Sequence, residues 1–191
     1  MLSPARKRMT VDEFIAWAME RPETEHYELC HGEIVAMAPE RLSHSQMKFE
    51  ITRKLSDAIA AARLGCAAFV VGPGVWVDDD TFYQPDTIVT CKTDLDPDSL
   101  YVPDPVLVVE VLSPSTQHID TNAKLADYFS ISSLKHYLIV RLQPFILTHY
   151  AREADGKIQV RLLPGGGTIT FDPPGFAIEL TGQAEAGGEP H

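Results

Sequence analysis

Two acidic residues occupy positions where an isolated negative charge would be costly. Glu110 interrupts the otherwise apolar run Pro105–Leu112, and Asp86 directly follows Pro85. A run of this composition is typical of a strand buried on both faces, where a carboxylate needs a cation or hydrogen-bond donors. We expect neighbouring strands to bring the two acids together, where Mg²⁺ or Mn²⁺ would satisfy both as a hard, oxygen-preferring cation. Alternatively, Asp86 is a turn residue and Glu110 bonds an arginine or backbone amides.

Lys124 lies on the helix predicted after the Glu110 strand. Asp120 and Tyr128 stand four residues to either side, so the three side chains share one helix face. By spacing alone, Asp120 and Lys124 form an ordinary surface ion pair. Beside a metal site, the lysine ammonium could instead orient an attacking water or stabilise charge that develops on a phosphate.

His44 and Glu28 are weaker candidates. At 100° per residue His44 falls at the centre of an apolar stripe that continues through Met47, which favours a core histidine with one backbone partner. Glu28 and Glu33 belong to a hairpin predicted around His31 and Gly32, and alternating exposed charges on that hairpin explain them equally well.

The elements that must position these residues follow from capping, periodicity and turn signals. Capping boxes are predicted at Thr10 with Glu13 and at Ser43 with Gln46. We expect helices over about 11–19, 43–64 and 120–130, strands over 67–71, 75–77, 86–91, 105–112 and 136–140, and hairpin strands over 27–37, 145–150, 157–163 and 168–171. This order predicts an α/β (α+β) fold, a mixed sheet flanked by helices with additional N- and C-terminal hairpins. Residues 1–180 are expected to form one domain and 181–191 a disordered tail.

Composition narrows the possible functions. The 191 residues carry a net charge of −11, which argues against broad nonspecific binding to a polyanion, so a nucleic-acid contact would have to be local. No stretch is long and apolar enough for a membrane helix. The three cysteines, Cys30, Cys66 and Cys91, share no zinc or disulfide-framework spacing, and a reducing cytoplasm fits them best.

Three other site types are excluded by single positions. The Asp94-x-Asp96-x-Asp98 segment begins like a calcium loop but has Ser99 where glycine is required. Gly165-Gly-Gly167 is not followed by lysine and serine or threonine, which excludes a phosphate-binding loop, and no Gly-x-Ser-x-Gly elbow is present.

The block Glu110-Val-Leu-Ser-Pro-Ser-Thr116, followed by Asp120-x-x-x-Lys124-x-x-x-Tyr128, resembles the bacterial "putative restriction endonuclease" family, long catalogued as a domain of unknown function. Pro85-Asp86 fits the same pattern. That family belongs to the PD-(D/E)XK nuclease superfamily, so the resemblance implies a restriction-endonuclease-like fold, cleavage of DNA and a homodimer. It also implies that Asp86 and Glu110, with the Val111 carbonyl, bind Mg²⁺ or Mn²⁺.

One position departs from the superfamily pattern. A lysine two residues after the second acid helps activate water there, and that position is Leu112 in this chain. The family resemblance implies that Lys124, on the following helix, takes over, and that Glu28 and His44 match family positions. Two functions follow: a metal-dependent endonuclease, or a noncatalytic module of the same fold that binds a protein or nucleic-acid partner.

Overall fold

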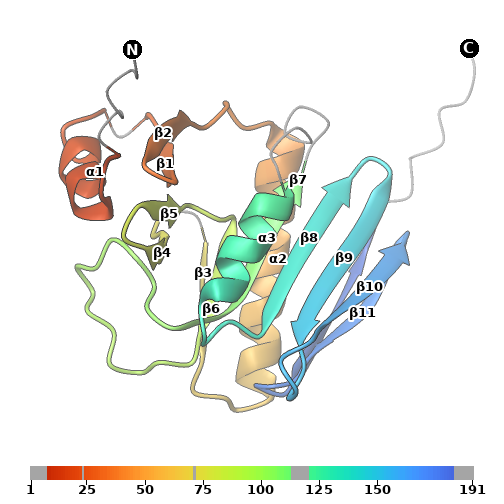
Figure 1. Ribbon diagram of the computed structural model, residues 1–191. Helices are drawn as coiled ribbons and strands as arrows, with labels where there is room; N and C mark the ends of the chain where they lie inside the picture. The colour runs from red at the N-terminus through yellow and green to blue at the C-terminus, as the bar shows by residue number, and fades with distance from the viewer. Residues whose placement is uncertain (1–7, 23, 71, 113–120, 183–191) are drawn as a thin grey trace, which may run out of the picture.

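The computed structural model describes residues 8–22, 24–70, 72–112 and 121–182. Its elements in chain order are α1 (Val11–Ala18), β1 (Tyr27–Cys30), β2 (Glu33–Ala36), α2 (Leu42–Ala61), β3 (Ala67–Val70), β4 (Val75–Asp78), β5 (Thr81–Tyr83), β6 (Thr87–Thr90), β7 (Pro105–Leu112), α3 (Thr121–Ser130), β8 (His136–Leu142), β9 (Phe145–Arg152), β10 (Ile158–Pro164), β11 (Gly166–Phe171) and β12 (Phe176–Thr181). The arrangement is shown in Figure 1.

The described strands form a six-stranded sheet in the order β10-β9-β8-β7-β6-β3, a four-stranded sheet β2-β1-β5-β4 and the pair β11-β12. Within the large sheet, β7 and β8 are parallel and are connected through α3, whereas β6 and β7 are antiparallel. Helix α2 and the β11-β12 pair pack on one face and α3 on the other (Figure 1). The predicted mixed sheet with flanking helices and extra hairpins is confirmed.

Strand β7 is buried because both faces of the sheet around it are covered. Val109 and Val111 belong to the apolar cluster beneath α2, and Val108 and Leu112 belong to the cluster beneath α3. Its continuous apolar composition is what a strand covered on both sides requires. The predicted bounds, 105–112, agree with the structure.

The predicted hairpin at His31 and Gly32 is confirmed. Both residues have positive φ, 48° and 78°, as a two-residue turn between right-twisted strands requires. A Cβ at Gly32 would also lie 2.5 Å from the Arg8 Cβ, so glycine is needed for space as well as for conformation.

Some local predictions were wrong. The capping box at Thr10 and Glu13 is present, but α2 begins at Leu42 with Arg41 as N-cap and has no side-chain cap, so the Ser43–Gln46 box does not form. Strands β5 and β12 were missed. Strand β5 has three residues, too few to show a period, whereas β12 alternates buried and exposed residues and could have been predicted.

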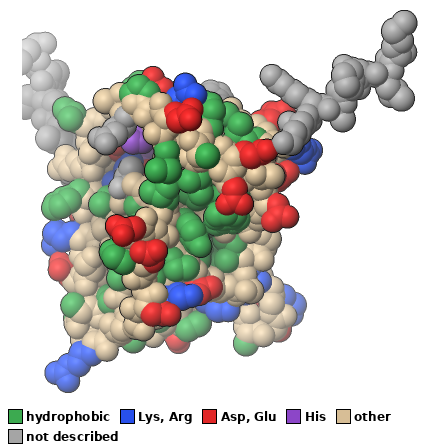
Figure 2. All heavy atoms as spheres, turned by 90° about the vertical axis from the view of Figure 1, so that its left-hand side faces the viewer, with side chains coloured by type: hydrophobic (Ala, Val, Ile, Leu, Met, Phe, Trp, Pro, Cys, Tyr) green, Lys and Arg blue, Asp and Glu red, His purple; other side chains and the backbone are tan. Residues whose placement is uncertain are grey.

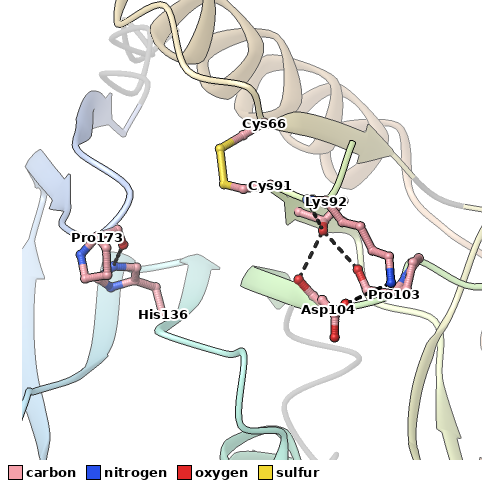
Figure 3. The surroundings of a disulfide bond; sticks show 8 residues. Cys66, Cys91, Lys92, Pro103, Asp104, His136 and Pro173 are labelled. Atoms are coloured by element: carbon pink, nitrogen blue, oxygen red, sulfur yellow. Dashed lines mark hydrogen bonds and ion pairs between the residues drawn. A yellow bond between two sulfur atoms is a disulfide. The ribbon is translucent and has the colours of Figure 1, made fainter. Parts of the chain in front are cut away.

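The structure also corrects the interpretation of the cysteines. Cys66 and Cys91 form a disulfide, which joins the segment after α2 to the end of β6 (Figure 3). Residues 67–70 of β3 pair with 87–90 of β6, so the antiparallel register brings the two cysteines opposite each other. Because the sequence separation of 25 residues hides this pairing, the cysteine count carries no argument for a reducing compartment.

The ends of the predicted domain are only partly described. Strand β12 continues to Thr181, and 183–191 lie outside the described residues, as does the segment 113–120 with Asp120. The disordered tail and the role of Asp120 therefore stay predictions. No helix within the described ranges is long and apolar enough to cross a membrane.

Candidate functional site

Asp86 lies immediately before β6, beside β7, and is held by three donors. Its Oδ2 accepts the Val111 backbone N–H at 2.6 Å and lies 3.2 Å from His44 Nε2, while its Oδ1 lies 2.9 Å from Lys48 Nζ. Burial alone would raise the pKa of Asp86, but the His44 hydrogen bond and the Lys48 charge outweigh it and hold the pKa below its ordinary value. The carboxylate is therefore ionised at neutral pH.

Glu110 is bonded by residues of α3, on the face of the sheet opposite to α2. Its Oε1 lies 3.1 Å from Lys124 Nζ and accepts the Tyr128 hydroxyl at 3.0 Å. Lys124 Nζ also lies 2.8 Å from Glu28 Oε1, which accepts the backbone N–H of Gln84 as well. One buried ammonium thus joins two carboxylates from β1 and β7.

The two halves of the site interact electrostatically. Burial is the largest cause that raises the pKa of Glu110, and although Lys124 opposes it, the charges of Asp86 and Glu28 add to it, so that the pKa reaches about 7. Thr87 stands opposite Val109 in the β6-β7 register and Asp86 accepts the Val111 N–H, so Asp86 and Glu110 occupy neighbouring positions of the two strands, as predicted. Four acids, Glu28, Glu40, Asp86 and Glu110, contact the two lysines Lys48 and Lys124, and a further cation would be favourable at this position.

Three sequence interpretations require correction. His44 bonds the Asp86 carboxylate and is not a core histidine with a backbone partner. Lys124 is 7% exposed, so it does not form a surface ion pair. Glu28 is buried, so it is not one of the exposed charges that alternate along a hairpin. Glu33 is exposed, as the hairpin pattern predicted.

Lys48 was missed by sequence reasoning although it is as buried as Lys124. It binds Asp86 and lies 3.1 Å from Glu40 Oε1. Its signal was present: it follows His44 by four residues, so an inward-facing His44 places Lys48 one turn further along the same face of α2.

Leu112 does not leave the site without a lysine. As the second residue after Glu110 it points to the same face of β7, where it packs in the apolar cluster that contains Tyr128. The ammonium at Glu110 comes from α3 through Lys124, in the place that the family resemblance implied.

A second layer supports Lys124. Its Nζ lies 4.7 Å from the centroid of the Tyr83 ring, a cation–π arrangement. The Tyr83 hydroxyl donates to Asp127 Oδ2 at 2.5 Å, and His31 Nε2 lies 3.4 Å from the same oxygen. None of these contacts was predicted, because each joins elements distant in the chain.

The donor set suits a hard divalent cation. Lys124 and Tyr128 both donate to Oε1 of Glu110. Among the described residues, no group donates to its second oxygen, Oε2. No group of three or more His, Cys, Asp or Glu arranged for a metal is found within the described ranges. Two carboxylates and one carbonyl agree with Mg²⁺, which keeps several waters and binds few protein ligands. A metal would have to compete with the two lysines.

A hollow in the described surface lies elsewhere. It has a volume of about 470 Å³ and is lined by Ile15, Lys92, Asp94, Asp96, Ser99, Leu100, Tyr101 and Pro103. Figure 2 views the α1 side of the molecule, where acidic side chains surround a band of hydrophobic ones. The hollow has one lysine beside its two aspartates, whereas Lys48 and Lys124 bring two ammonium groups to the Asp86–Glu110 cluster. Because cations attract a phosphate backbone, the cluster is the better candidate for chemistry on nucleic acid.

Comparison with known proteins identifies one family. The model of the family Uma2, described as "Putative restriction endonuclease", matches residues 11–183. Two relatives come from Synechocystis sp. "Uncharacterized protein sll1609" is 27% identical over 158 residues, 81% of this chain and 87% of the relative. "Uncharacterized protein slr1290" is 26% identical over 151 residues, 78% and 77% of the two chains.

A solved structure has the same fold. It is described as a "putative nuclease belonging to DUF820" from Anabaena variabilis, superposes with a TM-score of 0.69, and is 14% identical, with 91% of this chain and 94% of that chain covered. At this identity the likeness shows the fold alone, which is the predicted restriction-endonuclease-like one.

Proposed function

The chain belongs to the Uma2 family of restriction endonuclease-like proteins, and on that basis we propose that it is a metal-dependent endonuclease that hydrolyses phosphodiester bonds in DNA. The observation that carries the proposal is the buried cluster in which Asp86 and Glu110, from the adjacent β6 and β7 region, each meet a lysine: Lys48 from α2 at Asp86 and Lys124 from α3 at Glu110. Buried, mutually repelling carboxylates beside an ammonium are a typical arrangement for chemistry on a charged substrate.

Asp86, Glu110 and the Val111 carbonyl would hold Mg²⁺ or Mn²⁺. A bound divalent cation supplies two effects at such a site: it lowers the pKa of water, and it offsets the charge that develops on the phosphate. His44 and the Val111 N–H fix the orientation of the Asp86 carboxylate, and Tyr128 fixes that of Glu110. These hydrogen bonds position the ligands before substrate binds.

The two lysines act as cations in this proposal. Burial would lower the pKa of Lys124, but Glu110 and Glu28 outweigh it and raise the pKa above its ordinary value. Burial would also lower the pKa of Lys48, but the carboxylates of Asp86 and Glu40 outweigh it and raise the pKa above its ordinary value. Because both ammonium groups keep their protons at neutral pH, neither accepts a proton from water; each orients water or stabilises a charged phosphate.

The competing function is a noncatalytic module that binds a partner through the same fold. Two observations favour it: Leu112 replaces the usual lysine, and the net charge is −11. It predicts no divalent-metal binding at Asp86 and Glu110.

A cleavage assay separates the two functions. Supercoiled plasmid and single-stranded DNA are incubated with Mg²⁺ or Mn²⁺ and with wild type, Asp86→Asn, Glu110→Gln or the control Glu33→Gln, which changes an exposed acid. The nuclease proposal expects cleavage by wild type and Glu33→Gln only. Cleavage that persists in Asp86→Asn and Glu110→Gln would come from a contaminant, and absence of both cleavage and calorimetric metal binding in the wild type would refute the proposal.

A further inference from the structure

Strand β10 is one of the two edge strands of the six-stranded sheet and is unusually apolar for an edge. Six of its seven residues are exposed. The side chains of Ile158, Val160 and Leu162 are 36%, 50% and 65% exposed and, as alternate residues, project from one face. Natural edge strands are usually protected by charges, prolines, bulges or covering segments; β10 has only Arg161, between the apolar residues, and Pro164 at its end.

The free backbone groups of β10 belong to the same three residues. Glu153 N donates to Lys157 O at 2.8 Å, and the β9-β10 register continues without interruption to Pro164. In an antiparallel ladder, bonded and non-bonded pairs alternate, so Gln159 and Arg161 bond inward to β9. Ile158, Val160 and Leu162 therefore direct their N–H and C=O groups away from the sheet.

This edge is complementary to itself. In an antiparallel pair with Val160 on a two-fold axis, Ile158 faces Leu162 of the second copy, and Gln159 faces Arg161. A shift toward the C-terminal end would place Arg161 opposite its own copy and Pro164, which has no N–H, opposite Ile158. The Val160-centred register avoids the like-charge contact and uses all three outward-facing residues.

The surrounding surface also favours a second copy. Val160 and Leu162 pair with Tyr150 and Thr148 of β9 on the face that carries α3. Figure 1 shows α3 over the middle of this face, with β9 and β10 lying beyond it. Two joined edges would therefore place both apolar stripes side by side on one continuous sheet face, where each removes the other from water.

We propose that β10 is a homodimer interface, in which two chains pair antiparallel about Val160 and join their six-stranded sheets. A symmetric interface requires one patch to complement itself, which the register of β10 allows. The proposal is independent of the nuclease function.

Sedimentation equilibrium at micromolar protein tests the interface. Wild type and Val35→Lys should be dimers and Val160→Lys a monomer; Val35 is the matched control because it is 45% exposed on β2, an apolar edge strand of the four-stranded sheet. Circular dichroism verifies that each variant is folded. A monomeric wild type, or a dimeric Val160→Lys, would overturn the proposal.

Cysteine cross-linking tests the register without relying on a destabilised variant. In a Cys30→Ala background, which removes the free thiol, Val160→Cys should be cross-linked to itself by a short bis-maleimide. Ile158→Cys should not, because its two copies would lie about 13 Å apart, four residues along the strand. Cross-linking of Ile158→Cys in preference to Val160→Cys would refute the two-fold axis at Val160.

Discussion

Lys48 Nζ lies 2.9 Å from Asp86 Oδ1, so a lysine from α2 neutralises the first acid of the site just as Lys124 from α3 neutralises the second. The two helices lie on opposite faces of the sheet and bring their ammonium groups to the strands that carry the acids. The site therefore depends on the packing of both helices against β6 and β7.

Replacing each lysine should separate stability from activity. Lys124→Met leaves Glu28 and Glu110 buried without their cation, and the free energy of unfolding should fall by about 3 kcal/mol or more. Lys48→Met should cost less, because Asp86 keeps the His44 and Val111 donors. Urea unfolding measures both.

Loss of either ammonium should reduce cleavage about 100-fold, as loss of one preorganised donor does. The control Lys54→Met removes a partly exposed lysine that pairs with Glu50 on α2 and should change neither property appreciably. A folded Lys48→Met that cleaves DNA at the wild-type rate would contradict the role given to Lys48.

Glu110 should make the metal-free protein less stable as the pH rises. Its folded-state pKa of about 7 lies above the ordinary value of 4.5, so between these values the folded protein holds a proton that the unfolded chain has released. The stability that this protonated carboxyl contributes is present below pH 4.5 and lost by pH 7. Glu110→Gln should therefore gain about 3 kcal/mol relative to wild type across this window. Urea unfolding in EDTA measures the gain, and parallel stability curves would contradict it.

His149 should make the protein less stable as the pH falls, which is the opposite of the effect of Glu110. Burial is the main cause that lowers its pKa to about 4, with smaller contributions from the charges of His136 and Arg161. Between pH 6.5 and 4 the unfolded chain binds a proton that the folded protein does not, so stability falls as the pH falls, by about 3 kcal/mol.

The contacts of His149 show which nitrogens carry protons in the neutral histidine pair. The His136 Nε2–H donates to the Pro173 carbonyl at 2.8 Å, which leaves His136 Nδ1 to accept from His149 Nε2–H at 3.1 Å (Figure 3 shows the Pro173 contact). His149→Gln should flatten the acid limb of the stability curve, measured by thermal unfolding against pH. The exposed His26→Gln should leave that limb unchanged; an equal effect of both substitutions would argue against this assignment.

The disulfide should contribute measurably to stability. Closing a loop with a sequence separation of 25 restricts the unfolded chain by about 3 kcal/mol. The double variant Cys66→Ala/Cys91→Ala should lose that amount in urea unfolding, whereas Cys30→Ala, which removes a free cysteine, should lose much less. An unchanged midpoint in the double variant would show that the bond does not constrain the chain.

Much of the framework could be read from local patterns. The Thr10 cap, the His31-Gly32 turn and the uninterrupted apolar run of β7 are each set by neighbouring residues, so they were predicted correctly. The disulfide and the short strand β5 could not be predicted from local patterns. The disulfide depends on the β3-β6 register, and β5 is stabilised only by its neighbours in the sheet.

For the site, the sequence by itself determined Asp86 and Glu110, since a buried strand with a central acid and a preceding Pro-Asp restrict where the charges lie. It also placed Lys124 and Tyr128 on one helix face. Only the tertiary structure decided their partners: Glu28 meets Lys124 across 96 residues, and His44 meets Asp86 across 42. Helical and strand periods relate residues a few positions apart, whereas buried charges are paired by whichever elements pack together.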